Sequence, residues 1–116
     1  DIRKRILLMT NYNFGEILLL KFPYSEGLRE AKRPVVVLAQ TDVKDVVIAK
    51  VTSMEQRGKY DIAIDDWENV GLLFSSVVRI DKLATLSKHR VIKKLRSLDN
   101  SYKSKIISKI KQLFKI

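Results

Sequence analysis

The chain has 116 residues, a length that favours one domain with a modest hydrophobic core. Its 23 lysines and arginines exceed its 13 acidic residues and give a formal net charge of +10. This charge favours an anionic partner: nucleic acid first, then a membrane surface, then an acidic protein. The lack of cysteine excludes disulfide scaffolds and thiolate metal sites and suits a reducing cytoplasm. No apolar run is long enough to span a membrane.

Residues 1–13 are rich in basic side chains and are predicted to form a flexible arm. The chain from there to residue 98 contains short aliphatic runs separated by polar loops with Gly or Pro, the pattern of β-strands. The two longest such loops are 23–32 and 53–60. The last run, 91–98, also fits a short helix, but we favour a strand. The predicted strands are 15–22, 35–39, 46–52, 61–65, 75–81 and 91–98.

A helix is predicted over residues 99–116, where apolar residues recur at helical spacing and lysines occupy other faces. Asp99 or Asn100 can cap its first turn. Strands followed by one amphipathic helix indicate a mostly β fold with α: a small curled antiparallel sheet or barrel, residues 14–98, with the helix packed against it. We therefore predict one domain over residues 1–116. The apolar helix positions are Tyr102, Ile106, Ile107, Ile110, Leu113 and Phe114.

The segment Lys32–Leu38 is the most informative, because a basic pair runs through a proline into an aliphatic strand. Pro34 lacks an N–H and biases Arg33 toward an extended conformation, which holds the Arg33 guanidinium at the mouth of a core strand. With other segments in order and spacing, it makes residues 14–114 resemble the MazF/PemK toxins. The resembling segments are Gly15-Glu16-Ile17, Arg33–Leu38, Val51-Thr52-Ser53, and Gly71-Leu72 with Ser76–Leu83 and Thr85-Leu86.

The resemblance implies a compact SH3-like barrel, as in MazF and CcdB, with a C-terminal helix. It implies a ribosome-independent, sequence-selective endoribonuclease that is the toxin of a type II toxin–antitoxin pair. Such an enzyme cuts single-stranded RNA, including mRNA, without a metal or other cofactor. The resemblance further implies a cytoplasmic homodimer that an acidic antitoxin protein neutralises. Two alternatives stay open: a CcdB-like toxin that binds gyrase, and a catalytically silent RNA-binding relative.

Metal-independent RNA cleavage needs an activated 2′-OH, donors that stabilise charge on the phosphorane, and a proton for the leaving 5′-oxygen. The resemblance places four residues in the active pocket: Arg33, Thr52, Arg79 and Asp81. Both arginines are permanently charged planar donors, which suits them to electrostatic stabilisation of phosphate oxygens rather than acid catalysis. The Thr52 hydroxyl can bond a phosphate. Asp81, two residues after Arg79, shares its strand face and can orient it or accept the 2′-OH proton.

Four further residues are predicted to bind substrate: Glu16, Ser53, Lys32 and Tyr24. Glu16 is a second carboxylate near the same edge, and the Ser53 hydroxyl can contact a phosphate or a flipped base. Lys32 adds a positive charge beside Arg33. Tyr24 lies in a loop where some members of the family carry a histidine and this chain has none.

Each catalytic candidate also has a structural interpretation. Arg33 can form a surface ion pair at a loop, and Thr52 is an ordinary β-branched strand residue. Arg79 and Asp81 can form a salt bridge within their strand. Glu16 follows a glycine at a strand start, which is a common place for an acidic residue.

Three other residues invite functional interpretations that we rank lower. His89 is the only histidine, but it lies in a basic segment beside a predicted turn, which indicates a surface residue. Tyr60 and Trp67 flank the turn after the second loop and can stack RNA bases. A lone tryptophan in a small domain more often belongs to the core or to an interface.

Overall fold

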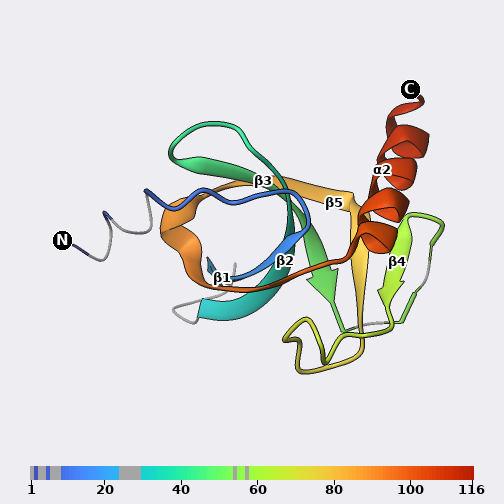
Figure 1. The fold of residues 1–116 in the computed structure, drawn as a ribbon, viewed down its shortest axis with the longest axis horizontal. Coiled ribbons are helices and arrows are strands. Elements are labelled where there is room, and N and C mark those ends of the chain that lie inside the picture. Colours follow the sequence, from blue (N-terminus) through green and yellow to red (C-terminus); the bar gives the residue numbers. More distant parts are fainter. Residues whose placement is uncertain (1, 3–4, 6–8, 24–29, 54, 57) are drawn as a thin grey trace.

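The computed structural model describes residues 2, 5, 9–23, 30–53, 55, 56 and 58–116 (Figure 1). These residues form six strands in one sheet and a C-terminal helix, as the sequence predicted. The elements are β1 (Glu16–Pro23), β2 (Glu30–Gln40), β3 (Asp45–Thr52), β4 (Asp61–Ile64), β5 (Ser76–Ser87), the short 3-10 helix η1 (Lys88–Arg90), β6 (Val91–Ser97) and α2 (Asn100–Phe114).

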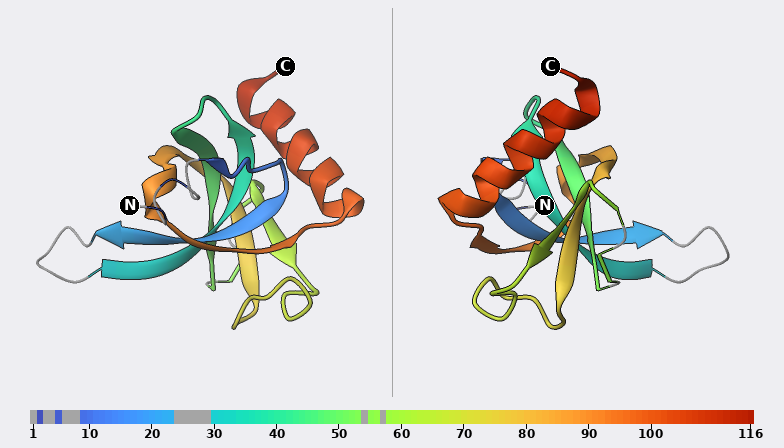
Figure 2. Two further views of the ribbon diagram at one scale, coloured as in Figure 1. Left: turned by 60° about the vertical axis from the view of Figure 1, so that its left-hand side comes forward. Right: turned by 90° about the vertical axis from the view of Figure 1, so that its right-hand side faces the viewer.

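The sheet has the strand order β4-β5-β3-β2-β1-β6, and every neighbouring pair is antiparallel. Figure 1 shows that the sheet is strongly curled, and Figure 2 shows β1 and β2 extending away from the body as a hairpin. The end strands β4 and β6 are not paired with each other in the described part of the chain. The structure therefore shows a curled sheet, and the closed barrel that the resemblance implied is not observed.

Alternate residues of the same strands supply two hydrophobic clusters on opposite faces of the sheet. In β3, Ala49 and Val51 belong to the first cluster, whereas Val46 and Ile48 belong to the second. A strand buried on both faces reads as a continuous aliphatic run, because side chains alternate between the faces. This explains why the strands were visible in the sequence as aliphatic runs.

Helix α2 begins where the sequence placed its cap. Asp99 Oδ1 accepts hydrogen bonds from the backbone N–H groups of Ser101 (3.0 Å) and Tyr102 (3.2 Å), which satisfies two donors of the first turn. Tyr102 and Ile106 are buried in the first cluster, and the Tyr102 hydroxyl accepts from the Asp65 N–H at 2.9 Å. These contacts pack α2 over β4 and β5 (Figure 1). No described helix is long and apolar enough to cross a membrane.

Two strands are longer than the sequence predicted. β2 begins at Glu30 rather than at residue 35, and β5 continues to Ser87 rather than ending at residue 81. The early part of β2 pairs with β1 through Lys21 and Lys32, which are polar residues in a projecting hairpin. In β2, backbone pairing extends the strand beyond its apolar stretch. The extension of β5 instead carries Leu83, Ala84 and Leu86, which pack against the two clusters.

The last residues of the predicted arm contact the sheet. Tyr12 is buried in the second cluster, and its N–H donates to Gln40 Oε1 at 2.9 Å. Lys88 of η1 is fully buried; its Nζ donates to the Thr10 carbonyl at 2.7 Å and lies 5.6 Å from the centroid of the Tyr12 ring. Burial lowers the pKa of Lys88. Thr10 and Tyr12 are therefore held by the body of the protein.

Candidate functional site

A cavity of about 340 Å³ lies between β1, β2, β3 and β6 on one side and the segment 71–76 on the other. This volume is at the lower end of the range of about 300–1,000 Å³ for small-molecule sites. Four residues that the sequence predicted for the site line it together: Lys32, Arg33, Thr52 and Ser53. Lys93 and Ser76 add a third cation and a third hydroxyl, and the other lining side chains are apolar.

The charge of the cavity is one-sided. None of the described residues that line it is an aspartate or a glutamate. Lys32, Arg33 and Lys93 are exposed, and none of the three makes a hydrogen bond or an ion pair with another described residue. Three cations without compensating carboxylates favour an anionic ligand, and the Arg33 guanidinium can grip a phosphate with two parallel donors.

The local sequence explains how Arg33 reaches the cavity. Arg33 pairs with Leu20 and Pro34 with Leu19 in the ladder between β1 and β2, so the Lys32-Arg33-Pro34 stretch is extended, as predicted. The Pro34 ring and Leu19 form part of the apolar wall beside the guanidinium. Because the backbone is held in the sheet, the Arg33 side chain can adjust its conformation to a ligand while its Cα stays in place.

Thr52 and Ser53 enter from the end of β3. Thr52 is the last residue of the strand, lies opposite Val77 of β5, and is half-buried, whereas Ser53 is exposed. The buried Val51 also lines the cavity, so the hydroxyls stand directly after a core position. The end of β3 thus brings the Thr52 and Ser53 side chains to the cavity wall.

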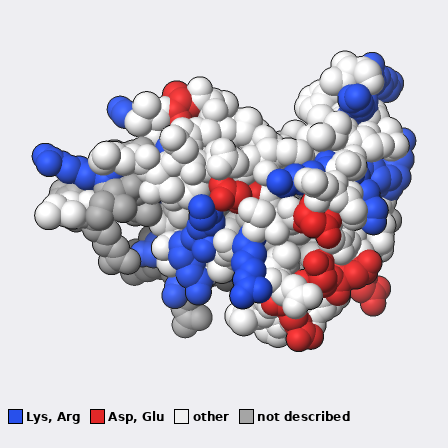
Figure 3. Space-filling model, in the orientation of Figure 1, with Lys and Arg blue, Asp and Glu red and all other residues white. Residues whose placement is uncertain are grey.

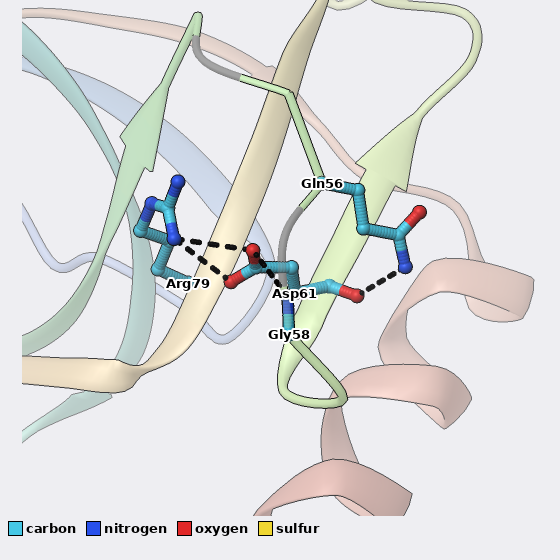
Figure 4. Close-up of polar contacts among 4 residues, drawn as sticks. All are labelled: Gln56, Gly58, Asp61 and Arg79. Atoms are coloured by element: carbon cyan, nitrogen blue, oxygen red, sulfur yellow. Dashed lines mark hydrogen bonds and ion pairs between the residues drawn. The ribbon is translucent and has the colours of Figure 1, made fainter.

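Arg79 does not line the cavity and has a protein partner (Figure 4). Its Nη1 lies 3.1 Å from Oδ2 and 3.4 Å from Oδ1 of Asp61, its cross-strand neighbour in β4. Asp61 also accepts from the Gly58 N–H at 3.3 Å, and Gln56 Nε2 donates to the Asp61 carbonyl at 2.9 Å. The Arg79 side chain is 18% exposed and that of Asp61 only 3%. Arg79 thus fastens β5 to β4, and Asp61 in turn connects β4 to the loop before it.

Asp81 is exposed at an irregularity of β5 and does not line the cavity. In the ladder with β3, Arg79 pairs with Lys50 and Leu83 with Ala49, so the residues between Arg79 and Leu83 have no partner in β3. This bulge interrupts the strict alternation that the sequence argument assumed. The carboxylate that contacts Arg79 is that of Asp61, not Asp81.

Glu16 is buried at the start of β1 and is occupied by protein contacts. Its Oε1 accepts from the Asn13 N–H, and its Oε2 lies 3.0 Å from Lys94 Nζ. It does not line the cavity. Tyr24, the remaining predicted substrate-binding residue, lies outside the described residues.

The histidine and the tryptophan singled out earlier are placed as their structural interpretations predicted. His89 is exposed in η1, where its N–H donates to Ser87 Oγ at 3.2 Å. Tyr60 and Trp67 are half-buried and pack against the first hydrophobic cluster. None of these three lines the cavity.

Sequence reasoning missed several residues that the structure brings to the cavity, among them Lys93, Leu73 and Phe74. Lys93 lies opposite Leu19 in β6. Leu73 and Phe74 belong to the apolar run Gly71–Phe74, which precedes β5 without forming a strand. The apolar run was the only feature of the sequence that could have drawn attention to Leu73 and Phe74.

Acidic side chains form one group on the surface. Figure 3 shows this group toward the lower right of the face, with further acidic side chains beside lysines and arginines elsewhere on it. Asp65, Asp66 and Glu68 follow one another closely in the turn after β4. Among the described residues, no group of three or more His, Cys, Asp or Glu side chains is placed to hold a metal ion.

Comparison with known protein families matches residues 13–114 to the PemK-like, MazF-like toxins of type II toxin–antitoxin systems. The match covers most of the chain, and the chain therefore belongs to this toxin family. The family resemblance stated from the sequence is confirmed. No curated protein matches the chain.

Solved structures show the same fold. The Mycobacterium tuberculosis toxin MazF-mt6 is 20% identical with a TM-score of 0.71, over 87% of this chain and 97% of that one. A MazE–MazF complex (Form-III) from Deinococcus radiodurans is 19% identical with a TM-score of 0.74, over 90% and 97%. An endoribonuclease in complex with its cognate antitoxin from a mycobacterial species is 15% identical with a TM-score of 0.69, over 91% and 97%. At these identities the likeness establishes a common fold.

Proposed function

We propose that this toxin is an endoribonuclease that cuts single-stranded RNA, including mRNA, at selected sequences by attack of a ribose 2′-OH. The family supports a toxin, and a relative of the same fold is itself an endoribonuclease. One observation carries the proposal: the cavity brings Arg33, Lys32, Thr52 and Ser53 together and contains no carboxylate among its described lining residues. Such a site fits a phosphodiester.

In the proposed reaction the 2′-oxygen attacks the adjacent phosphorus, a 2′,3′-cyclic phosphate forms, and the 5′-oxygen leaves with a proton. Arg33 stabilises the negative charge that develops on the phosphorane oxygens. The Thr52 hydroxyl donates to a phosphate oxygen, while Lys32 and Ser53 hold the neighbouring nucleotide. A preorganised donor of this kind is worth about 10²–10³-fold in rate. This chemistry requires neither a metal nor another cofactor.

The remaining assignments stay predictions. The sequence predicts Arg79 and Asp81 as catalytic residues, with Asp81 as acceptor of the 2′-OH proton, and Glu16 and Tyr24 as substrate contacts. Neither Arg79 nor Asp81 lines the cavity of its own chain. The contacts of Arg79 with Asp61 and of Glu16 with Lys94 support structural roles for both.

We further propose that the protein acts in the cytoplasm as a homodimer and is neutralised by an acidic antitoxin. The sheet ends in β4 and β6, whose outer edges have no strand partner in the described chain, and a second subunit is a common cover for such edges. An acidic, partly disordered segment that folds on binding complements the cations of the cavity. Sizing with light scattering at micromolar concentration should give a dimer, and a monomer would contradict this.

The test of the reaction is cleavage of a long single-stranded RNA by the purified protein in EDTA. We expect defined cuts that end in a cyclic phosphate. Deoxyribose at a mapped scissile position should abolish the cut, because the nucleophile is missing. Activity that requires Mg²⁺, or that survives the deoxyribose substitution, overturns the mechanism. No cleavage of any RNA, together with a stable complex with gyrase, would replace it by the CcdB-like alternative.

A further inference from the structure

Two neighbouring apolar side chains stand exposed on the wall of the cavity. Leu73 is 82% exposed and Phe74 is 66% exposed, and both line the cavity. Transfer of apolar side chains of this size out of water lowers the free energy, and adjacent exposed ones often mark a binding site. A ligand that is bound in the cavity and covers Phe74 would be stabilised by this effect.

The segment that carries Phe74 is anchored to the protein. The buried Ser76 donates from its hydroxyl to the Phe74 carbonyl at 2.7 Å. On the other side, the Leu72 N–H donates to the Trp67 carbonyl at 3.0 Å, and the Leu72 side chain is buried. Anchors on both sides reduce the entropy that Phe74 loses when a ligand binds.

The turn that leads into this segment is fixed as well. Gly71 has a φ of +90°, a conformation that side chains other than glycine resist. Arg96 of β6 donates from Nη1 to the Asn69 carbonyl at 2.9 Å, which ties the turn to the strand beside the cavity. The backbone at Phe74 is thus held in place by the fold before any ligand arrives.

The side chains of the cavity favour a ligand with two different parts. Lys32, Arg33 and Lys93 attract an anion, whereas Phe74 supplies an aromatic ring. A nucleotide combines a phosphate with a flat base, and base–aromatic stacking is the common way in which proteins hold unpaired nucleotides. A volume of about 340 Å³ fits one base with its phosphate better than a folded helix of a protein partner.

We infer that Phe74 is a base-stacking residue of this site: its ring packs on one unpaired base next to the phosphate that the cations hold. The inference rests on the proposed endoribonuclease activity and deepens it by adding a substrate-positioning residue. Because every base has an aromatic face, the contact contributes to binding and placement of the RNA more than to the choice of base.

The experiment compares Phe74→Ala, Phe74→Leu and Phe74→Trp with the wild type. The substrate is a short single-stranded RNA around a cut site that the wild type has mapped, with deoxyribose at the scissile position for binding measurements. We expect Phe74→Ala to weaken binding by about 5- to 150-fold and Phe74→Trp to restore it. Phe74→Leu should stay close to Phe74→Ala, because leucine is apolar but cannot stack.

Phe114→Ala is the matched control. Phe114 ends α2, is 57% exposed and does not line the cavity, so its loss removes the same ring elsewhere on the surface. Binding should be unchanged in this variant. Thermal unfolding verifies that all variants are folded. We expect them to be, because both positions are exposed. Equal binding of the Phe74→Leu variant and the wild type overturns stacking and indicates general apolar contact, as for a peptide of an antitoxin.

An abasic scan identifies the partner base. Each nucleotide near the cut is replaced in turn by an abasic one, and each RNA is tested with the wild type and with Phe74→Ala. If Phe74 stacks on one base, removal of that base should weaken wild-type binding and have almost no further effect in Phe74→Ala. Additive losses at every position overturn the inference. Failure of the wild type to cut any RNA would instead overturn the proposed function.

Discussion

Two arginines of the same sheet differ in what neutralises their charge. Arg79 of β5 is 18% exposed and pairs with the buried Asp61 at 3.1 Å (Figure 4). Arg33 of β2 is exposed and makes no hydrogen bond or ion pair with another described residue. A paired guanidinium stabilises the fold, whereas an unpaired one keeps its charge and its donors for a ligand. Residue type alone therefore does not distinguish a binding arginine from a structural one.

The same contrast holds for the lysines. Lys88 is buried with its Nζ on the Thr10 carbonyl, and Lys94 pairs with Glu16, so both have partners within the chain. Lys32 and Lys93 line the cavity without a partner among the described residues. The net charge of +10 thus combines cations that hold the fold with cations that face a ligand. The cations of the second group are the ones that are placed to meet a ligand in the cavity.

The largest effect is expected for Arg33→Ala. The substitution removes a donor from the developing phosphorane and should lower the cleavage rate by roughly 10²-fold or more. The free energy of unfolding should change little, because no described contact of the guanidinium is lost. Initial rates on a single-stranded RNA and thermal unfolding are measured on the same preparation. His89→Ala, an exposed change outside the cavity, is the control and should cut at the wild-type rate.

Full activity of Arg33→Ala would show that the cavity is not the reaction centre. A folded but inactive His89→Ala would move the centre to η1. Either result would show that the lack of a protein partner does not identify the functional arginine.

The opposite outcome is expected for Arg79→Ala. It removes the Arg79 cation from Asp61, which is 3% exposed, and should lower the free energy of unfolding by ~1–3 kcal/mol. Arg79→Lys keeps the charge and should cost less. At a temperature where the variants remain folded, both should cut RNA at nearly the wild-type rate. A variant that is as stable as the wild type but inactive would instead support the catalytic role that the sequence predicted.

The partner of Arg79 illustrates what the sequence could and could not reveal. Aliphatic runs predicted the six strands and apolar spacing predicted α2, because burial imposes both patterns. The choice of Asp61 over Asp81 depends on the register between β4 and β5, where Arg79 lies directly opposite Asp61. Register follows from tertiary packing, and the bulge after Arg79 was not encoded in any local pattern.

The cavity was predictable only in part. Arg33 and Thr52 came from a recognisable order of segments, and the structure places both on one wall. Lys93 and Phe74 arrive from distant parts of the chain through the curl of the sheet, and the curl was expected only in outline. Residues that reach a site by way of tertiary structure, without a local motif, are the ones that sequence reasoning misses.

A smaller effect is expected for Thr52→Val, which keeps the β-branched shape and deletes the hydroxyl. If that hydroxyl donates to a phosphate, the cleavage rate should fall by about 10- to 150-fold, the weight of one hydrogen bond to a charged group. Thr52→Ser should restore most of the rate. Thr85→Val is the control, since Thr85 is an exposed residue of β5 that does not line the cavity. Equal rates for Thr52→Val and Thr85→Val would exclude a role for the hydroxyl.

The smallest effect is expected for Glu16→Gln. This variant tests whether the Glu16 carboxylate serves a contact within the protein or a contact with RNA. Gln keeps an acceptor for the Asn13 N–H but loses the charge that attracts Lys94, whose side chain is 46% exposed. Solvent screens such a pair, so the free energy of unfolding should fall by no more than about 1 kcal/mol. Lys94→Gln is the matched partner variant, and the double variant should cost less than the sum of the two because both remove one interaction. RNA affinity should stay the same, since Glu16 does not line the cavity. A marked loss of RNA binding in Glu16→Gln, absent in Lys94→Gln, would return Glu16 to the substrate-binding residues that the sequence predicted.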